Sequence, residues 1–141
     1  MKVVLPLLVA LTAAVSTVAS NPNTDDASTP LTIRKASPFF CNHMALTAAD
    51  RKRHFDELGP KLRSLRKGAR ELKDGYEFEF PGDASTYQLL TEWAIQERLC
   101  CPFFDINLRL EPENGPIWLS LTGRPGTKEF IKVDAPTWIK Q

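Results

Sequence analysis

The sequence predicts a small single domain of the α+β class, with helices packed on an antiparallel or mixed sheet in the order α-β-α-β-β-α. Apolar residues recur at steps of three and four in two long stretches, which is typical of amphipathic helices. Shorter stretches alternate apolar and polar residues, as half-buried strands do. A chain of 141 residues is long enough for one hydrophobic core and too short for two comfortable ones.

The first predicted helix begins after Thr47, an expected N-cap that forms nearly a capping box with Asp50. Gly59-Pro60 interrupts its hydrogen bonding, so we expect a kink or two short helices, with Pro60 starting the second. We expect the helical region to end at Gly75. Its apolar stripe consists of Phe55, Leu58, Leu62, Leu65, Ala69 and Leu72.

A strand and a second helix are expected next. The sequence YEFEF at 76–80 alternates as a half-buried strand does, and Pro81-Gly82 turns the chain. Asp83 is the expected N-cap of the second helix, which extends to about Cys101 and ends before Pro102.

A hairpin and a short helix are predicted to complete the domain. The two strands lie in 103–112 and 116–123 and are joined by a turn around Glu113-Asn114-Gly115. Residues 126–133 form the last predicted helix, and the tail is expected to pack through Trp138 and Ile139.

The N-terminal region predicts export. Residues 1–20 contain Lys2, an apolar run and then small residues, which are the three parts of a secretory signal peptide. An uncleaved anchor is the alternative. Residues 21–38 are rich in Asn, Asp, Ser, Thr and Pro, and we interpret them as a flexible tether. The single α+β domain then occupies 39–141, in a periplasmic or extracellular protein.

The charge balance limits the partners that we expect. The chain has 18 basic and 17 acidic residues, and removal of 1–20 takes away one lysine, which leaves 17 of each. We therefore expect no nucleic-acid binding, which needs a concentrated positive surface. We also expect no membrane contact after signal removal, and the sequence GRPGTK at 123–128 departs from nucleotide-loop spacing, so no nucleotide or organic cofactor is indicated. The sequence predicts no particular protein partner.

Cys41, Cys100 and Cys101 are an odd number of cysteines for an exported protein, so at most one internal disulfide can form. A bond between the two adjacent cysteines would strain the end of a helix. If the exported protein oxidises, we expect Cys41 to pair with Cys100, because Pro102 leaves Cys101 at the helix exit, where its thiol stays reachable.

Glu97 is predicted to lie on the apolar face of the second helix, one turn before Cys100 and Cys101. A buried carboxylate needs a partner, because its desolvation costs several kcal/mol. One interpretation is a structural Arg51–Glu97 ion pair between the two helices. The other is a shared site in which Glu97, the cysteines and His54 face one pocket.

Thiolate, imidazole and carboxylate groups together are the ligands of zinc and of softer, thiophilic ions. Adjacent cysteines suit a trigonal, sulfur-bound ion better than a tetrahedral one. The leading hypothesis is therefore a thiophilic metal or metalloid site, of open ion identity, made by Cys41, Cys100, Cys101, Glu97 and His54. One alternative is a thiol-dependent enzyme or redox protein with a vicinal cysteine as nucleophile and His54 as base. Another is a disulfide-stapled interaction module without chemistry.

Three stretches of the sequence resemble a family of small uncharacterised bacterial proteins. These are CNHMALTAADRKRH at 41–54, EWAIQERLCCPFF at 92–104 and GPIWLSLTGRPGTKEF at 115–130. The resemblance covers about 41–131, and its most specific part is the Cys-Cys-Pro-Phe block. It implies a common fold and a common Cys/His/Glu pocket, in a family with no settled activity.

Overall fold

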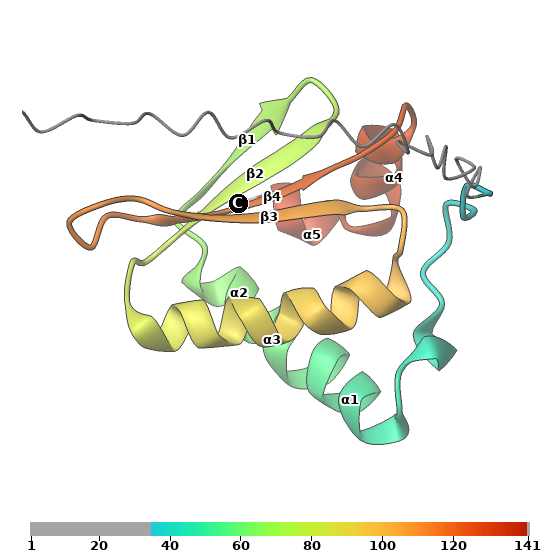
Figure 1. Cartoon of the computed structure of the whole chain (residues 1–141), viewed down its shortest axis with the longest axis horizontal. Helices are drawn as coiled ribbons and strands as arrows, with labels where there is room; N and C mark the ends of the chain where they lie inside the picture. Colours follow the sequence, from blue (N-terminus) through green and yellow to red (C-terminus); the bar gives the residue numbers. More distant parts are fainter. Residues whose placement is uncertain (1–34, 141) are drawn as a thin grey trace, which may run out of the picture. The chain divides into compact units, whose positions relative to one another are not determined.

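Residues 35–140 are described by the computed structural model of the chain, shown in Figure 1. The predicted signal peptide at 1–20 and most of the predicted tether lie outside the described residues.

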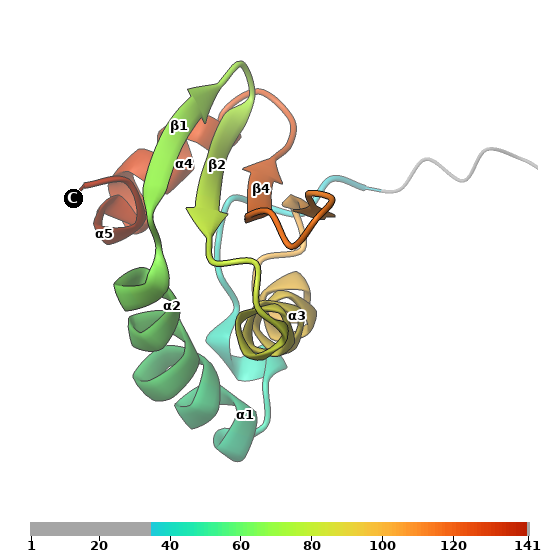
Figure 2. The same ribbon diagram turned by 90° about the vertical axis from the view of Figure 1, so that its left-hand side faces the viewer.

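One four-stranded antiparallel sheet forms the centre of the fold, which confirms the α+β prediction (Figures 1 and 2). The order across the sheet is β1-β2-β4-β3, so two hairpins meet where β2 pairs with β4. The predicted hairpin at 113–115 is present, with Glu113 and Asn114 at positive φ in its turn. The strands are β1 (Gly68–Leu72), β2 (Gly75–Phe80), β3 (Asp105–Leu110) and β4 (Ile117–Thr122).

Helices cover one face of the sheet and one of its ends (Figure 2). Helix α3 carries the predicted Asp83 cap, whose carboxylate accepts from the Thr86 N–H at 2.9 Å. The helical elements are η1 (His43–Ala45), α1 (Ala48–Lys52), the π-helical η2 (Arg53–Leu58), α2 (Gly59–Leu65), α3 (Ala84–Cys100), α4 (Thr127–Asp134) and α5 (Pro136–Ile139). Among the described residues, no helix combines the length and apolarity needed to cross a membrane.

The first helical region starts as predicted, with the Asp50 N–H donating to Thr47 Oγ1 at 3.1 Å. It passes Gly59-Pro60 through a π-helical turn, in which the Gly59 N–H donates to the His54 carbonyl five residues before it. Its predicted end at Gly75 is wrong, because α2 ends at Leu65. Ala69 and Leu72, which fitted the apolar stripe of the predicted helix, belong instead to β1. Their pairing with β2 decides their conformation, although their spacing in the sequence also suits a helix.

Gly75 opens β2 rather than ending a helix. A side chain at this position would meet the Leu121 carbonyl oxygen at 1.9 Å, so only glycine allows β4 to approach so closely. The close approach brings both hairpins into one sheet.

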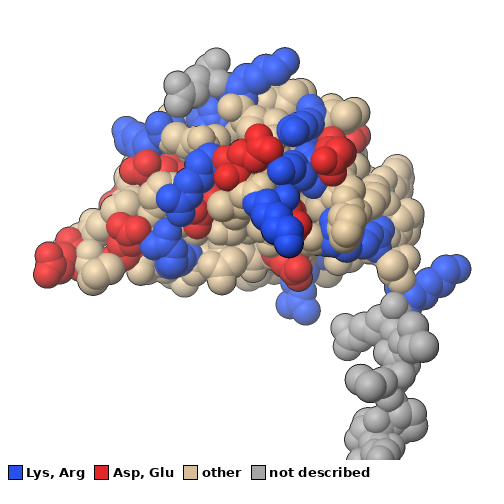
Figure 3. Space-filling model, turned by 90° about the horizontal axis from the view of Figure 1, so that it is seen from above, with Lys and Arg blue, Asp and Glu red and all other residues tan. Residues whose placement is uncertain are grey.

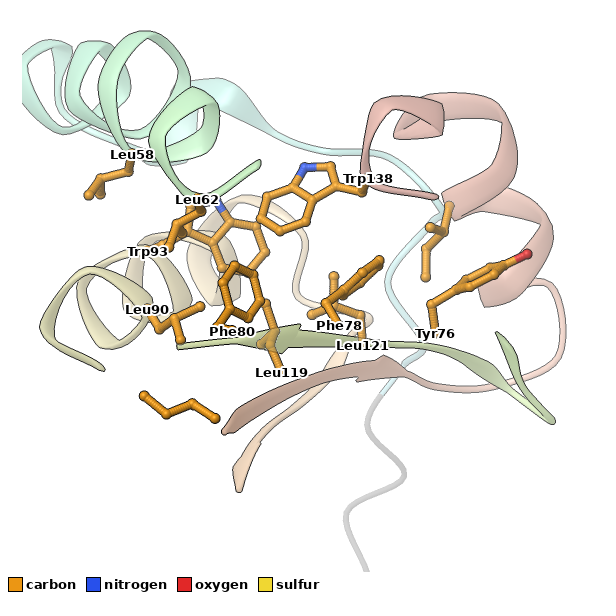
Figure 4. Packing of buried hydrophobic residues seen from close by; sticks show 12 residues of the cluster. Leu58, Leu62, Tyr76, Phe78, Phe80, Leu90, Trp93, Leu119, Leu121 and Trp138 are labelled. Carbon is orange, nitrogen blue, oxygen red and sulfur yellow. The ribbon is translucent and has the colours of Figure 1, made fainter. Parts of the chain in front are cut away.

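The core lies between the sheet and the helices (Figure 4). Alternate residues of β2 and β4 point into it, and Trp93 of α3 meets Trp138 of α5 with ring centroids 5.0 Å apart. The buried residues of this cluster are Leu58, Leu62, Tyr76, Phe78, Phe80, Leu90, Trp93, Ile117, Leu119, Leu121, Ile131 and Trp138. Trp138 therefore packs the tail as predicted.

The opposite face of the sheet is polar. Glu77 of β2 is buried there beneath Arg70 and Arg109, which also lie over the ring of Trp118. On the molecular face drawn in Figure 3, positive and negative side chains are intermixed. These contacts explain why β2 is more buried than a half-exposed strand.

Candidate functional site

The three cysteines form one cluster at the end of α3. Cys41 and Cys101 are joined by a disulfide with a Cα–Cα distance of 4.6 Å, and Cys100 is a free, fully buried thiol. All three sulfur atoms lie within 4.8 Å of one another. The cluster brings together positions that are 60 residues apart in the chain.

The predicted Cys41–Cys100 pairing is wrong, because Cys101 is the partner. Cys100 is the last residue of α3, and its side chain stays on the buried face of that helix. Cys101 has left helical geometry, with φ −121° and ψ 71°, and bonds to the incoming N-terminal segment. A backbone bond from the Asn42 N–H to the Cys100 carbonyl, 2.8 Å long, holds that segment in place.

The Cys100 thiol lies in an apolar environment with Leu46 and Phe103. Burial, and next the nearby carboxylate of Glu97, raises the pKa of this thiol to about 11. Cys100 is therefore a protonated, weakly nucleophilic group at neutral pH.

We expect native Cys100 to react with iodoacetamide far more slowly than unfolded Cys100 at pH 8. Its rate should rise about tenfold per pH unit until about pH 11 in the folded protein. The folded state keeps a proton that the unfolded state loses above its ordinary pKa of 9.0, so stability should decline between pH 9 and 11. Timed alkylation with mass spectrometry measures the rate, and fast native labelling at pH 8 would contradict this assignment.

Glu97 is buried as predicted, and its partner is His54 of η2. The His54 Nε2 lies 2.8 Å from Glu97 Oε2, and the two residues are only 2% and 8% exposed. The other ring nitrogen, Nδ1, faces Gln96 Oε1 at 3.2 Å. Both ring nitrogens of His54 thus have polar neighbours within hydrogen-bond distance.

The predicted Arg51–Glu97 pair is absent from the described residues. The Arg51 guanidinium instead contacts the His43 carbonyl at 3.4 Å and Met44 Sδ at 3.2 Å. It lies on the part-exposed side of α1, one turn before the buried His54. A different arginine–glutamate pair, which was not predicted, links the helices: Arg53 donates two 2.8 Å bonds to Glu92 at the surface.

Aromatic rings hold the His54–Glu97 pair in position. The ring of His54 stacks on Trp93 at a centroid distance of 5.5 Å and meets the edge of Phe55 at 4.7 Å. Both ring nitrogens are directed at Glu97 and Gln96, so neither forms a hydrogen bond to a cysteine in the described structure. His54 is therefore not placed as the general base of a cysteine nucleophile in this structure.

A cavity of about 720 Å³ lies beside the pair and the disulfide. Four of the five predicted site residues line it, namely Cys41, Cys101, His54 and Glu97, while Cys100 does not. Its walls come from the segment after Phe39, from η2 and α3, and from the α4–α5 region. The structure thus places most of the predicted site around one space.

Sequence reasoning missed most of this cavity. It also missed Gln96, which is 8% exposed and faces His54 without lining the cavity. The far wall comes from α4 and α5, whose residues the sequence analysis did not connect with the site. The aromatic residues lining the cavity are Phe40, Phe55, Trp93, Phe104, Phe130 and Trp138.

The set of residues able to hold a metal is smaller than predicted. Only the three cysteine sulfurs are close enough together to share one ion among the described residues. They can do so only as thiolates, after reduction of the Cys41–Cys101 bond. His54 and Glu97 bind each other beside this sulfur cluster.

Comparisons with protein-family models, curated proteins and solved structures found no match to this chain. The fold and the site define a small α+β domain in which a disulfide and a buried thiol lie beside a cavity lined by aromatic residues.

Proposed function

We propose that the protein binds one thiophilic metal or metalloid ion through Cys41, Cys100 and Cys101 when its disulfide is reduced. The observation that supports this most is the approach of all three sulfurs to within 4.8 Å. Reduction turns a disulfide and one thiol into three potential thiolate ligands.

The geometry favours a trigonal, sulfur-bound ion. Thiolates are soft ligands that select soft ions over hard, oxygen-preferring ones. The cluster supplies three sulfurs and no fourth protein ligand among the described residues. Binding of a metal cation would release the proton of Cys100 despite the raised pKa of its thiol, so the affinity for such a cation should increase with pH.

His54 and Glu97 are positioning residues in this proposal. Their bond joins η2 to the last turns of α3, directly before the two adjacent cysteines. Groups outside the ligand set commonly fix ligand geometry in this way.

Export is part of the proposal, as is membership in the bacterial family that 41–131 resembles. The signal-like sequence at 1–20 supports export, and a disulfide is compatible with an oxidising compartment. In such a compartment, a disulfide-stapled interaction module without chemistry is the second candidate function. A structural disulfide and an unreactive Cys100 are the features that such a module requires.

Arsenite is a suitable probe, because arsenous acid exchanges its three hydroxyls for three thiols, whose protons leave with the hydroxyls as three waters. A phosphine reduces the disulfide first and is itself oxidised to phosphine oxide. We expect the reduced protein to bind one arsenite per chain, and the oxidised protein to bind none. Cys100→Ala should weaken binding by about 100-fold or more, because one of three chelating groups is lost.

Isothermal titration under anaerobic conditions gives both stoichiometry and affinity. Ser85→Ala, at an exposed residue of α3 outside the cluster, is the control and should bind arsenite as the wild type does. If the reduced, folded wild type does not bind arsenite, the metal-binding proposal is refuted and the disulfide-stapled module is left as the candidate function. Unchanged affinity in Cys100→Ala would refute the three-sulfur site.

A further inference from the structure

We infer that the ligand suited to this site is an organic derivative of a soft metalloid or metal, in which one apolar substituent occupies the cavity and the soft atom binds Cys41 and Cys101. The inference rests on the proposed thiophilic site and names its ligand class.

The first argument for this ligand class is the size and position of the cavity. A bare ion needs only the space between the sulfurs, whereas the adjoining cavity measures about 720 Å³. Cys41 and Cys101 line this cavity and Cys100 does not. A soft atom bound to the two lining thiolates would therefore direct any further substituent into the cavity.

The cavity lining indicates the chemistry of that substituent. Six aromatic side chains contribute to the wall, and Trp93 and Trp138 lie next to each other (Figure 4). Polar residues also line the cavity, among them Arg63 and Asp134. Beside the disulfide, however, His54 and Glu97 are hydrogen-bonded to each other, so an apolar group entering there breaks no bond between them. An aryl group fits such a lining, because it buries apolar surface against aromatic rings.

The number of lining cysteines matches the valence of such a compound. Trivalent arsenic with one carbon substituent keeps two exchangeable positions. Phenylarsine oxide, hydrated to its dihydroxy form, reacts with two thiols to form two As–S bonds and releases two hydroxyls as water. The disulfide must first accept two electrons from a phosphine, which takes an oxygen from water and becomes a phosphine oxide. Cys100 takes no part in this reaction.

The test compares phenylarsine oxide with methylarsine oxide on the reduced full chain, by competition titration followed through tryptophan fluorescence. Both compounds form the same two As–S bonds, so the difference between them reports the cavity. We expect phenylarsine oxide to bind at least about tenfold more tightly than methylarsine oxide, because its ring becomes buried in the cavity. Cys100→Ala should preserve the ratio of the two affinities, although it weakens the binding of arsenite.

Ala135→Phe fills the cavity from the junction of α4 and α5. It should bring the phenyl-to-methyl ratio close to one and leave arsenite affinity unchanged. Ala49→Phe, at an exposed position of α1 outside the cavity, is the matched control and should keep the wild-type ratio. If Ala135→Phe fails to fold, Thr137→Trp at the exposed rim of the same cavity replaces it.

Equal affinity for phenyl and methyl compounds in the wild type would overturn the inference, even when arsenite binds. A preference for phenyl that survives in folded Ala135→Phe or Thr137→Trp would overturn it as well. Loss of arsenite binding in Cys100→Ala with a retained phenyl preference supports both proposals. An arsenite affinity unchanged in Cys100→Ala, with the phenyl preference retained, would refute the three-sulfur site alone.

Discussion

Reduction of the Cys41–Cys101 disulfide is expected to lower the free energy of unfolding by about 4 kcal/mol in the chain-entropy treatment, for a separation of 60 residues. Domains of this size are stable by only about 5–15 kcal/mol, so the loss is a large share of the total. The melting temperature should decrease by about 15 °C or more. Calorimetry with and without a phosphine reductant measures both quantities.

Cys41→Ala should reproduce the effect of reduction, because it removes the same crosslink. Cys100→Ala is the control, since it keeps the disulfide and should cost about 1 kcal/mol, as a small core truncation does. If reduction lowers the free energy of unfolding by less than about 1 kcal/mol, the disulfide does not restrict the conformations of the unfolded chain as the entropy treatment requires.

Glu97→Ala is expected to destabilise the fold by about 3 kcal/mol or more, the cost of removing one member of a buried polar pair. His54 would keep its place between Trp93 and Phe55 without its 2.8 Å partner. Urea unfolding measures the loss. Replacing both members of the pair, in His54→Phe with Glu97→Leu, should restore much of the stability.

Arg51→Ala provides the comparison, because Arg51 was the other candidate partner of Glu97. Its effect should add to that of Glu97→Ala within about 0.5 kcal/mol, as expected for residues without a shared contact. A substantial coupling between Arg51 and Glu97 would mean that the pairing with His54 is not the one that stabilises the protein.

Local signals predicted most of the fold. Thr47 and Asp83 cap helices where expected, and alternation located β2 and the β3–β4 hairpin. The strand β1 was missed because Ala69 and Leu72 also satisfy helical spacing. Only the pairing of β1 with β2, a tertiary effect, decides between the two conformations.

The site was predicted in outline. Glu97 was found because a carboxylate on an apolar helical face demands a partner, and the cysteine cluster because an odd thiol count demands an explanation. The choice of Cys101 over Cys100 depends on backbone angles after the last helical turn, which spacing on a wheel does not contain. The α4–α5 wall of the cavity depends on how distant elements pack, and no local pattern encodes that.

Under our proposal, the cluster has two states. The disulfide seen in the structure crosslinks the N-terminal segment to the end of α3, and the reduced cluster would, as proposed, offer three sulfurs to a soft ion. An ion that binds only the reduced state would also offset part of the stability lost with the disulfide, in proportion to its concentration over its dissociation constant.

The central claim is that Cys41, Cys100 and Cys101 together hold one soft ion. X-ray absorption at the arsenic edge, on reduced wild-type protein loaded with one equivalent of arsenite, tests it most directly. We predict three sulfur neighbours around arsenic and no oxygen neighbour, and two sulfurs with one oxygen in Cys100→Ala. An arsenic spectrum dominated by oxygen in the wild type, with all three thiols still open to alkylation under denaturing conditions, would contradict the claim.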